Sequence, residues 1–213
     1  MGFRARAAAS AIVLFARFVT AVRGVWQGSE PTIRQRVYFA NHVSHGDMIL
    51  IWTVLPPALR QRTRAVAAAD YWTTSPIRTF IGRDVFNAVL IQRDASKRVE
   101  DPVKQMTDAI DEGSSLILFP EGTRNDTDEK LTAFKSGLYN LAVARPGVEL
   151  VPTWIDNLNH VMPRGRYIPV PLICTVTFGA PIHVQPSEQK DDFIARARAA
   201  LLALAPAENG ARA

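Results

Sequence analysis

The chain is poor in cysteine and has no long uninterrupted apolar run. Its 213 residues include a single cysteine, Cys174, which excludes an intrachain disulfide and a cysteine-based zinc site and fits a reducing compartment. The apolar neighbours of Cys174 predict a small core residue. Arg17 and Arg23 interrupt the most hydrophobic segment, so no stretch of 18 uncharged apolar residues marks a membrane-spanning helix.

Positive charge is concentrated in the first half of the chain. Residues 1–100 carry 14 Lys and Arg against 6 Asp and Glu, whereas residues 101–213 carry 11 against 14. A basic half predicts a polyanionic partner, either nucleic acid, an anionic membrane or a phosphorylated substrate. The alternative is an arginine-rich composition without a function. The arginines are scattered, and no RNA-binding motif with interleaved aromatic residues occurs, so nucleic acid is disfavoured.

The segment 7–26 has the pattern of an amphipathic helix. On a helical wheel its large apolar residues fall on one side and its arginines on the other, the apolar set being Leu14, Phe15, Phe18, Val19, Val22, Val25 and Trp26. This pattern is typical of a helix that lies among lipid headgroups. We therefore expect residues 1–28 to form a peripheral or monotopic attachment to an anionic membrane surface, at its cytoplasmic face. The alternative is a helix packed on the protein's own core.

The body of the chain, predicted as one domain over 29–206 before a flexible tail at 207–213, alternates strand and helix patterns. Strands are predicted at 37–40, 65–69, 88–92, 114–120, 148–155 and 170–179, and helices at 47–55, 75–84, 102–113, 133–144 and 187–204. Strands that are apolar on both faces predict an α/β fold with a mainly parallel central sheet flanked by helices. Because chemistry in such folds gathers beyond the carboxyl ends of strands, the loops after 37–40 and 114–120 are expected to meet.

The polar stretch NHVSHGD follows the first of these strands and allows three interpretations. A metal site of His42, His45 and Asp47 is disfavoured, because side chains at this spacing diverge across a turn and no distant ligand cluster completes the set. An acid–base pair requires a histidine that accepts a proton and a carboxylate that fixes its tautomer, which His42 and Asp47 provide. The third interpretation is a polar turn, with Asp47 capping the next helix and His45 a solvated turn residue.

Several cationic and small residues follow other predicted strands. In PEGTR, Gly122 and Thr123 offer a close backbone approach, and Arg124 offers bidentate binding of an anion. Lys135 and Arg93 are further candidate cations. One histidine base together with several cations predicts a site for a phosphorylated alcohol.

The blocks NHxSxxD (41–47), FPEGTR (119–124) and FKxG (134–137) resemble those of the glycerolipid acyltransferase family, whose best-known members are lysophosphatidic acid acyltransferases. The resemblance covers residues 36–185. It implies that His42 deprotonates the acceptor hydroxyl and that Asp47 orients His42. It also implies that Glu121, Gly122 and Arg124 bind the glycerol phosphate, with Arg93 in a second block of the family. Thr123 and Lys135 are added as candidate substrate-binding residues from their place in PEGTR and FKxG.

The implied reaction is transfer of a fatty acyl chain to the free hydroxyl of a lysophospholipid, foremost 1-acylglycerol-3-phosphate, in phospholipid biosynthesis. The donor is expected to be acyl-CoA or acyl-carrier protein as co-substrate, with no bound cofactor or metal and no covalent acyl-enzyme. Three alternatives stay open. They are an acceptor that is another lysolipid or an amino acid lipid, a hydrolase that uses the same histidine, and a lipid-binding protein without chemistry.

Overall fold

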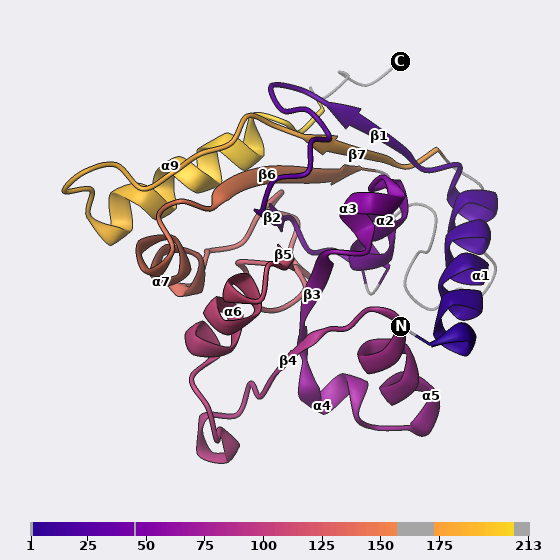
Figure 1. Ribbon diagram of the computed structural model, residues 1–213. Coiled ribbons are helices and arrows are strands. Elements are labelled where there is room, and N and C mark those ends of the chain that lie inside the picture. Colours follow the sequence, from indigo (N-terminus) through magenta and orange to yellow (C-terminus); the bar gives the residue numbers. More distant parts are fainter. Residues whose placement is uncertain (1, 45, 157–172, 207–213) are drawn as a thin grey trace.

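The computed structural model describes residues 2–44, 46–156 and 173–206. Within them, seven strands form one sheet in the order β1-β7-β6-β2-β5-β3-β4 (Figure 1). All neighbouring strands run parallel except β6 and β7, which are antiparallel. The strands are β1 (Arg23–Trp26), β2 (Arg36–Ala40), β3 (Thr63–Ala68), β4 (Val89–Ile91), β5 (Ser115–Leu118), β6 (Glu149–Asp156) and β7 (Thr175–Phe178).

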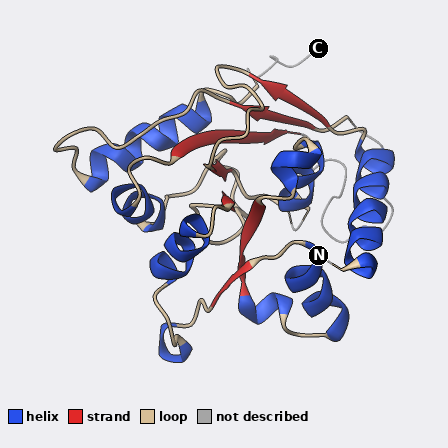
Figure 2. Ribbon diagram, in the orientation of Figure 1, coloured by secondary structure: helices blue, strands red, loops and turns tan. Residues whose placement is uncertain are grey.

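Helices cover both faces of the sheet (Figure 2). One face carries α1 (Phe3–Thr20), α2 (Asp47–Val54) and α3 (Pro57–Arg60), and the other carries α6 (Pro102–Asp111), α7 (Gly137–Ala144) and α9 (Lys190–Leu202). Four shorter helical elements follow β3 and β4, namely α4 (Ala69–Trp72), α5 (Pro76–Thr79), the π-helix η1 (Phe80–Val85) and the 3₁₀-helix η2 (Ala95–Lys97). The predicted α/β class with a mainly parallel sheet is confirmed.

The central strand β2 shows why these strands are apolar on both faces. All five of its residues are buried. Tyr38 and Ala40 pack towards α1 and α2, while Val37 and Phe39 pack towards α6, α7 and α9. Side chains alternate across a strand, so a strand between two helical layers needs apolar residues at every position.

The N-terminal helix is shorter than predicted. Helix α1 ends at Thr20, where Ala21 adopts a left-handed conformation with φ of 43°, and Arg23–Trp26 then pairs with β7 as an edge strand. Trp26 stacks on Phe178 with ring centroids 4.1 Å apart. The prediction of one helix through residue 26 is therefore wrong, because sheet pairing and aromatic packing outweigh the helical periodicity of this segment.

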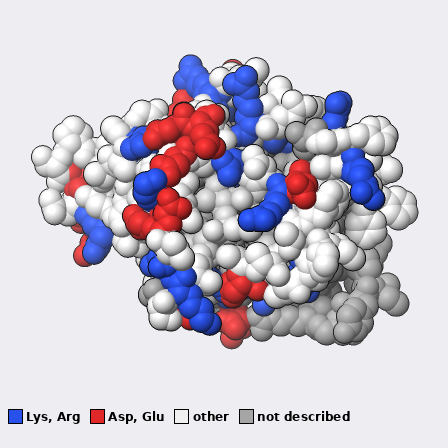
Figure 3. All heavy atoms as spheres, turned by 60° about the horizontal axis from the view of Figure 1, so that its bottom comes forward, with Lys and Arg blue, Asp and Glu red and all other residues white. Residues whose placement is uncertain are grey.

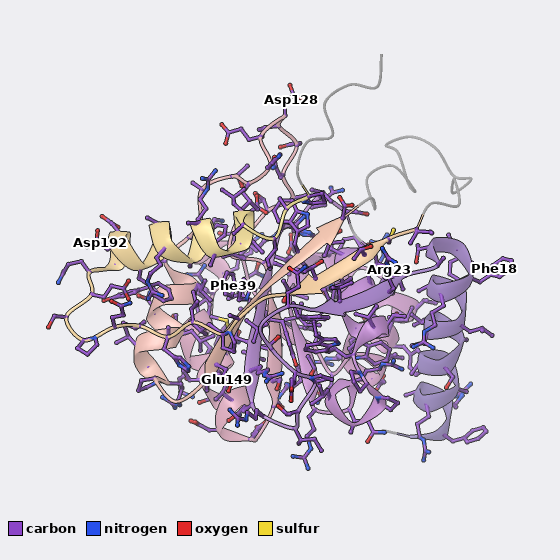
Figure 4. The ribbon with its side chains drawn as sticks, turned by 90° about the horizontal axis from the view of Figure 1, so that it is seen from above. Phe18, Arg23, Phe39, Asp128, Glu149 and Asp192 are labelled. Atoms are coloured by element: carbon purple, nitrogen blue, oxygen red, sulfur yellow. The ribbon has the colours of Figure 1, made fainter. Side chains whose placement is uncertain are left out.

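The two sides of α1 also differ from the predicted arrangement. Small residues face the core, with Ala5 and Ala16 buried and Val19 partly buried. Phe3, Leu14 and Phe18 are 87%, 72% and 85% exposed, and Phe18 projects away from the body (Figure 4). The alternative of core packing is thus correct for the alanine side, while the large apolar residues remain outside. No described helix has the length and apolarity that crossing a bilayer requires.

Two other predictions concern residues that the structure leaves undescribed. The strand predicted at 170–179 is seen from Thr175 to Phe178, and residues 157–172 lie outside the described residues, as does the predicted tail at 207–213.

The basic residues of the first half do not form one continuous positive surface on the face shown in Figure 3. On this face, Lys and Arg are interspersed with Asp and Glu.

Candidate active site

The turn after β2 is fixed to the sheet by a buried asparagine. Asn41 is 2% exposed, and its amide both donates to the carbonyl of Ile155 at 3.0 Å and accepts from the N–H of Ile155 at 2.8 Å. Both ends of the Asn41 amide are therefore tied to the backbone of β6. This pair of hydrogen bonds sets the position at which the chain leaves the sheet and enters the polar turn.

His42 and Asp47 form the pair that the sequence predicts. The Nδ1 atom of His42 lies 2.8 Å from Oδ2 of Asp47, whose side chain is fully buried. Since a carboxylate only accepts hydrogen bonds, Nδ1 carries the proton, and Nε2 of a neutral ring is the nitrogen that can take a proton from an acceptor. The geometry is that of a general base held in one tautomer.

The carboxylate of Asp47 holds the turn rather than capping the helix. Its Oδ2 also accepts the N–H groups of Val43 and Ser44, at 2.7 and 2.8 Å, and α2 has no side-chain cap at its start. The predicted capping role is therefore wrong, because Asp47 accepts N–H groups of the turn before α2 and not those at the start of the helix. His45, the predicted turn residue, lies outside the described residues.

The FPEGTR loop meets this turn, as predicted, because β5 lies beside β2. The ring of Phe119 stacks on the His42 imidazole, with centroids 4.2 Å apart and 20° between the planes. The carbonyl of His42 accepts the N–H of Asn125 at 2.6 Å. One loop thus contacts both the ring and the backbone of the histidine.

Glu121 lies buried beside the backbone of His42. It is 3% exposed, its Oε1 accepts the N–H of His42 at 2.8 Å, and its Oε2 accepts the N–H and hydroxyl of Thr132 at 2.8 and 2.6 Å. Glu121 does not line the cavity described below. Its hydrogen bond to the backbone of His42 holds the histidine in place, and its contact with glycerol phosphate stays a prediction.

A cavity of about 810 Å³ opens at the carboxyl ends of β2, β3, β4 and β5. Six of the eight predicted site residues line it, namely His42, Arg93, Gly122, Thr123, Arg124 and Lys135, while Asp47 and Glu121 lie behind its wall. Its remaining lining is largely apolar, with Met48, Val66, Trp72, Ile91, Val103, Met106, Leu118 and Leu138. A hydrogen-bonded histidine, several cations and an apolar wall therefore share one space.

Gly122 allows the lysine to reach this space. Its φ is +74°, and a Cβ at this position would lie 2.7 Å from Nζ and 2.8 Å from Cδ and Cε of Lys135. The Lys135 side chain thus lies directly over the Gly122 backbone. The left-handed conformation favours glycine here, and a side chain at this position would displace the flexible end of Lys135.

Comparison with known proteins is consistent with these blocks. A family described as Acyltransferase matches residues 26–156, which is more than half of the chain. The chain belongs to this acyltransferase family.

Curated relatives in this family include 1-acyl-sn-glycerol-3-phosphate acyltransferases. The protein of Chlamydomonas reinhardtii is 30% identical over 138 residues, covering 64% of this chain and 38% of the relative. That of Haemophilus influenzae is 24% identical over 155 residues, covering 68% and 57%. The chain thus spans less than two thirds of the length of these relatives.

A solved acyltransferase has the same fold. The crystal structure of the 1-acyl-sn-glycerophosphate (LPA) acyltransferase PlsC from Thermotoga maritima matches with a TM-score of 0.70 and 22% sequence identity, covering 93% of this chain and 79% of that one. At this identity the match shows the shared fold of the family and places the sheet and its flanking helices in a known arrangement.

The cavity also has lining residues that the sequence did not predict. Arg98 lines it from the loop after β4, and Tyr71 and Trp72 line it from α4. The signal that could have found the two aromatics is their place directly after the β3 strand, at the sheet edge where sites gather. Arg98 lies in an exposed loop that has no recognisable sequence pattern, so its place at the cavity is seen only in the folded structure.

Two other kinds of group bear on the chemistry of this part of the molecule, metal ligands and the cysteine thiol. Within the part of the chain that the structure describes, no three His, Cys, Asp or Glu side chains are grouped so that they could hold a metal ion. Cys174 is fully buried, and burial, with the nearby charges of Asp156 and Asp47, raises the pKa of its thiol to about 11. A thiol in this state does not act as a nucleophile.

Proposed function

We propose that the chain transfers a fatty acyl group from a thioester to the free hydroxyl of 1-acylglycerol-3-phosphate, as a step of phospholipid biosynthesis. The observation that carries this proposal is the His42–Asp47 pair, which opens onto the same cavity as Arg124 and Lys135. A base that faces a hydroxyl and cations that face a phosphate are the two requirements of this acceptor.

The proposed step is a direct transfer. Nε2 of His42 takes the proton of the acceptor hydroxyl while the oxygen attacks the carbonyl carbon of the thioester. The carbon–sulfur bond then breaks, and the leaving thiolate receives the proton from the imidazolium. Asp47 stabilises the charged ring through Nδ1. The buried Cys174 takes no part, and the proposed direct attack passes through no acyl-enzyme.

The cavity separates the two ends of the substrates. The cationic lining residues suit the acceptor phosphate, and the apolar lining residues suit the acyl chain. Substrates that displace water from the cavity would favour transfer to the alcohol over hydrolysis. Either acyl-CoA or acyl-carrier protein supplies the thioester in this proposal.

Acyl transfer to 1-acylglycerol-3-phosphate in mixed micelles tests the proposal, with labelled acyl-CoA and acyl-carrier protein compared as donors. His42→Ala should lower kcat by about 100-fold or more, because a general base typically contributes that much. Thr132→Ser, which keeps the hydroxyl on Glu121, serves as a folded control near the site.

Equal rates in wild type and His42→Ala would disprove the proposed mechanism. Release of free fatty acid that is unaffected by the acceptor would identify a hydrolase instead. Rates that rise only with another lysolipid or an amino acid lipid would keep the chemistry and change the acceptor.

We also propose that α1 attaches the enzyme peripherally to an anionic membrane surface at the cytoplasmic face. Phe3, Leu14 and Phe18 expose a ridge of large apolar side chains opposite the alanine side that packs on the core. Arg6 and Arg17 are exposed beside this ridge, as anionic headgroups require. Because α1 packs against α2, whose first residue is Asp47, attachment would bring the site to its lipid substrate.

Vesicle sedimentation tests this attachment with Leu14→Gln/Phe18→Gln, which keeps good helix formers at both positions. Partitioning to vesicles rich in phosphatidylglycerol should fall at least about tenfold, because the variant lacks two apolar side chains that insert into the bilayer in this proposal. Val143→Gln removes an exposed apolar residue of α7, on the opposite face, and should change nothing. Unchanged partitioning of the double variant would contradict the proposal. If the wild-type protein were a dimer and the double variant a monomer, the exposed side of α1 would instead bind a second copy of the chain.

A further inference from the structure

An ion pair at the end of β4 links one cavity residue to a residue outside the cavity wall. Asp70, on α4, accepts from Nε of Arg93 at 3.1 Å and from Nη2 at 2.5 Å. This hydrogen bonding lowers the pKa of Asp70 and raises the pKa of Arg93, so both groups are charged at neutral pH. Arg93 lines the cavity and Asp70 does not.

The two hydrogen bonds leave part of the Arg93 guanidinium available. A guanidinium presents five N–H donors in a planar fork, along two edges that each bind an oxyanion bidentately. Asp70 occupies the edge formed by Nε and Nη2. The edge formed by Nη1 and the second N–H of Nη2 is the one left to bind a phosphate.

A second arginine lines the same cavity. The side chain of Arg98 donates to the carbonyls of Gln92 and Arg93, at 3.2 and 3.4 Å. These bonds hold Arg98 beside Arg93.

Arg93 follows β4, whereas Arg124 follows β5. Strand β3 lies between β4 and β5, which places the backbones of β4 and β5 about 10 Å apart. Ala67 and Ala68, at the end of β3, also line the cavity.

We propose that Asp70 is a positioning residue that holds Arg93, beside Arg98, as a receptor for a phosphate group of one of the two substrates. This inference rests on the proposed acyl transfer. The phosphate is either that of the acceptor or the one on the phosphopantetheine arm that CoA and carrier protein share. Holding a long side chain in its binding geometry before the ligand arrives removes an entropic cost, and its loss raises KM about 3- to 10-fold.

The test combines variants with substrates that lack one phosphate. Asp70→Asn keeps the size of the side chain and removes its charge, while Asp70→Glu restores the charge. Acceptors are 1-acylglycerol-3-phosphate and 1-acylglycerol, and donors are acyl-phosphopantetheine and acyl-pantetheine. We expect Asp70→Asn to raise KM for one phosphorylated substrate with kcat nearly unchanged, to have no effect on its phosphate-free partner, and to be rescued in part by Asp70→Glu.

The chain offers a matched control. Asp111 forms a similar two-bonded ion pair with Arg145, and neither residue lines the cavity. Asp111→Asn should therefore leave every KM unchanged. If Asp111→Asn and Asp70→Asn had the same effect, a general loss of surface charge would explain both, and the proposal would be wrong.

The source of the phosphate follows from which pair shows the effect. An effect confined to the acceptor pair identifies the acceptor phosphate, and one confined to the donor pair identifies the phosphopantetheine phosphate. An unchanged KM in Asp70→Asn overturns the proposal. A lower KM also overturns it, because Asp70 would then compete with the phosphate for the Arg93 guanidinium. Calorimetric binding of glycerol 3-phosphate and phosphopantetheine to wild type and Asp70→Asn answers the same question without turnover, so failure of the proposed function is distinguished from failure of this inference.

Discussion

The two ends of strand β2 carry two charged pairs with opposite properties. At its amino end, Arg36 pairs with Glu149 of the neighbouring strand β6. At its carboxyl end, the chain continues into His42, which pairs with Asp47. Figure 4 shows how far apart these ends lie, with Glu149 at one end of the sheet and the loop of Asp128, which follows β5, at the other.

The pair at the amino end is fully hydrogen-bonded. Arg36 is 3% exposed, and its guanidinium donates to Glu149 at 2.8 Å, to the carbonyl of Glu30 at 2.6 Å and to the hydroxyl of Thr32 at 3.2 Å. Every nitrogen of the guanidinium has a partner. This buried pair lies away from the cavity lining, and its contribution is to structure.

The pair at the carboxyl end has unused capacity. Oδ1 of Asp47 is buried and has no hydrogen-bond partner among the described residues, and only one ring nitrogen of His42 is bonded to Asp47. Burial of an unpaired carboxylate oxygen costs stability. The comparison teaches that charge at the amino end of β2 stabilises the fold, whereas the pair that follows its carboxyl end is less completely satisfied, as a pair with the proposed role in chemistry would be.

The largest expected effect comes from Asp47→Asn. An amide oxygen in the place of Oδ2 would still accept the N–H groups of Val43, Ser44 and the His42 ring, but the neutral side chain would not stabilise the imidazolium that forms during the reaction. We expect kcat to fall on the order of 100-fold or more, with KM for the acceptor nearly unchanged. Steady-state kinetics over a range of acceptor concentrations measures both, and a kcat within threefold of wild type would show that Asp47 acts only on structure.

Glu149→Gln should have the opposite outcome. Removing the charge leaves Arg36 buried without its counter-ion, and breaking a buried pair typically costs about 3 kcal/mol or more of unfolding free energy. Glu149 lies at the far end of the sheet from the cavity, so kcat per folded molecule should stay at the wild-type value. Urea unfolding and kinetics on the same preparation test the contrast, which fails if stability changes by less than about 0.5 kcal/mol.

The sequence predicts the local parts of the site well. His42 and Asp47 are five positions apart, so one turn brings them together. The meeting of this turn with the FPEGTR loop follows from the parallel sheet, since neighbouring parallel strands end at the same edge. The order of strand and helix patterns likewise predicts the layers of the fold.

The remaining parts depend on contacts that no local pattern encodes. Strand β1 exists because it pairs with β7, about 150 residues later in the chain. The direction of the Glu121 side chain is set by Thr132 and the backbone of His42. Arg93 is paired with Asp70 across two different elements. In each case the deciding partner is known only once the chain is folded.

The smallest expected effect is a pH dependence of the difference in unfolding free energy between wild type and Glu149→Gln. Burial acts to raise the pKa of Glu149, but hydrogen bonds and charge from Arg34 and Arg36 outweigh it, so the pKa lies below the ordinary value of 4.5. A carboxyl group with a lowered pKa stabilises the fold fully above its unfolded pKa, and this stabilisation is lost as the pH falls through its folded pKa.

The stability difference between wild type and Glu149→Gln should therefore be constant from pH 7 to about 5.5 and shrink below about pH 4.5. Other carboxyl groups with lowered pKa, such as Asp111 and Glu188, are present in both proteins and cancel in the difference. Urea unfolding at pH 7, 5.5, 4.5 and 3.5 measures it. A difference as large at pH 3.5 as at pH 7 would mean that Glu149 contributes through packing and not through its charge, and that the amino end of β2 is not held by the ion pair.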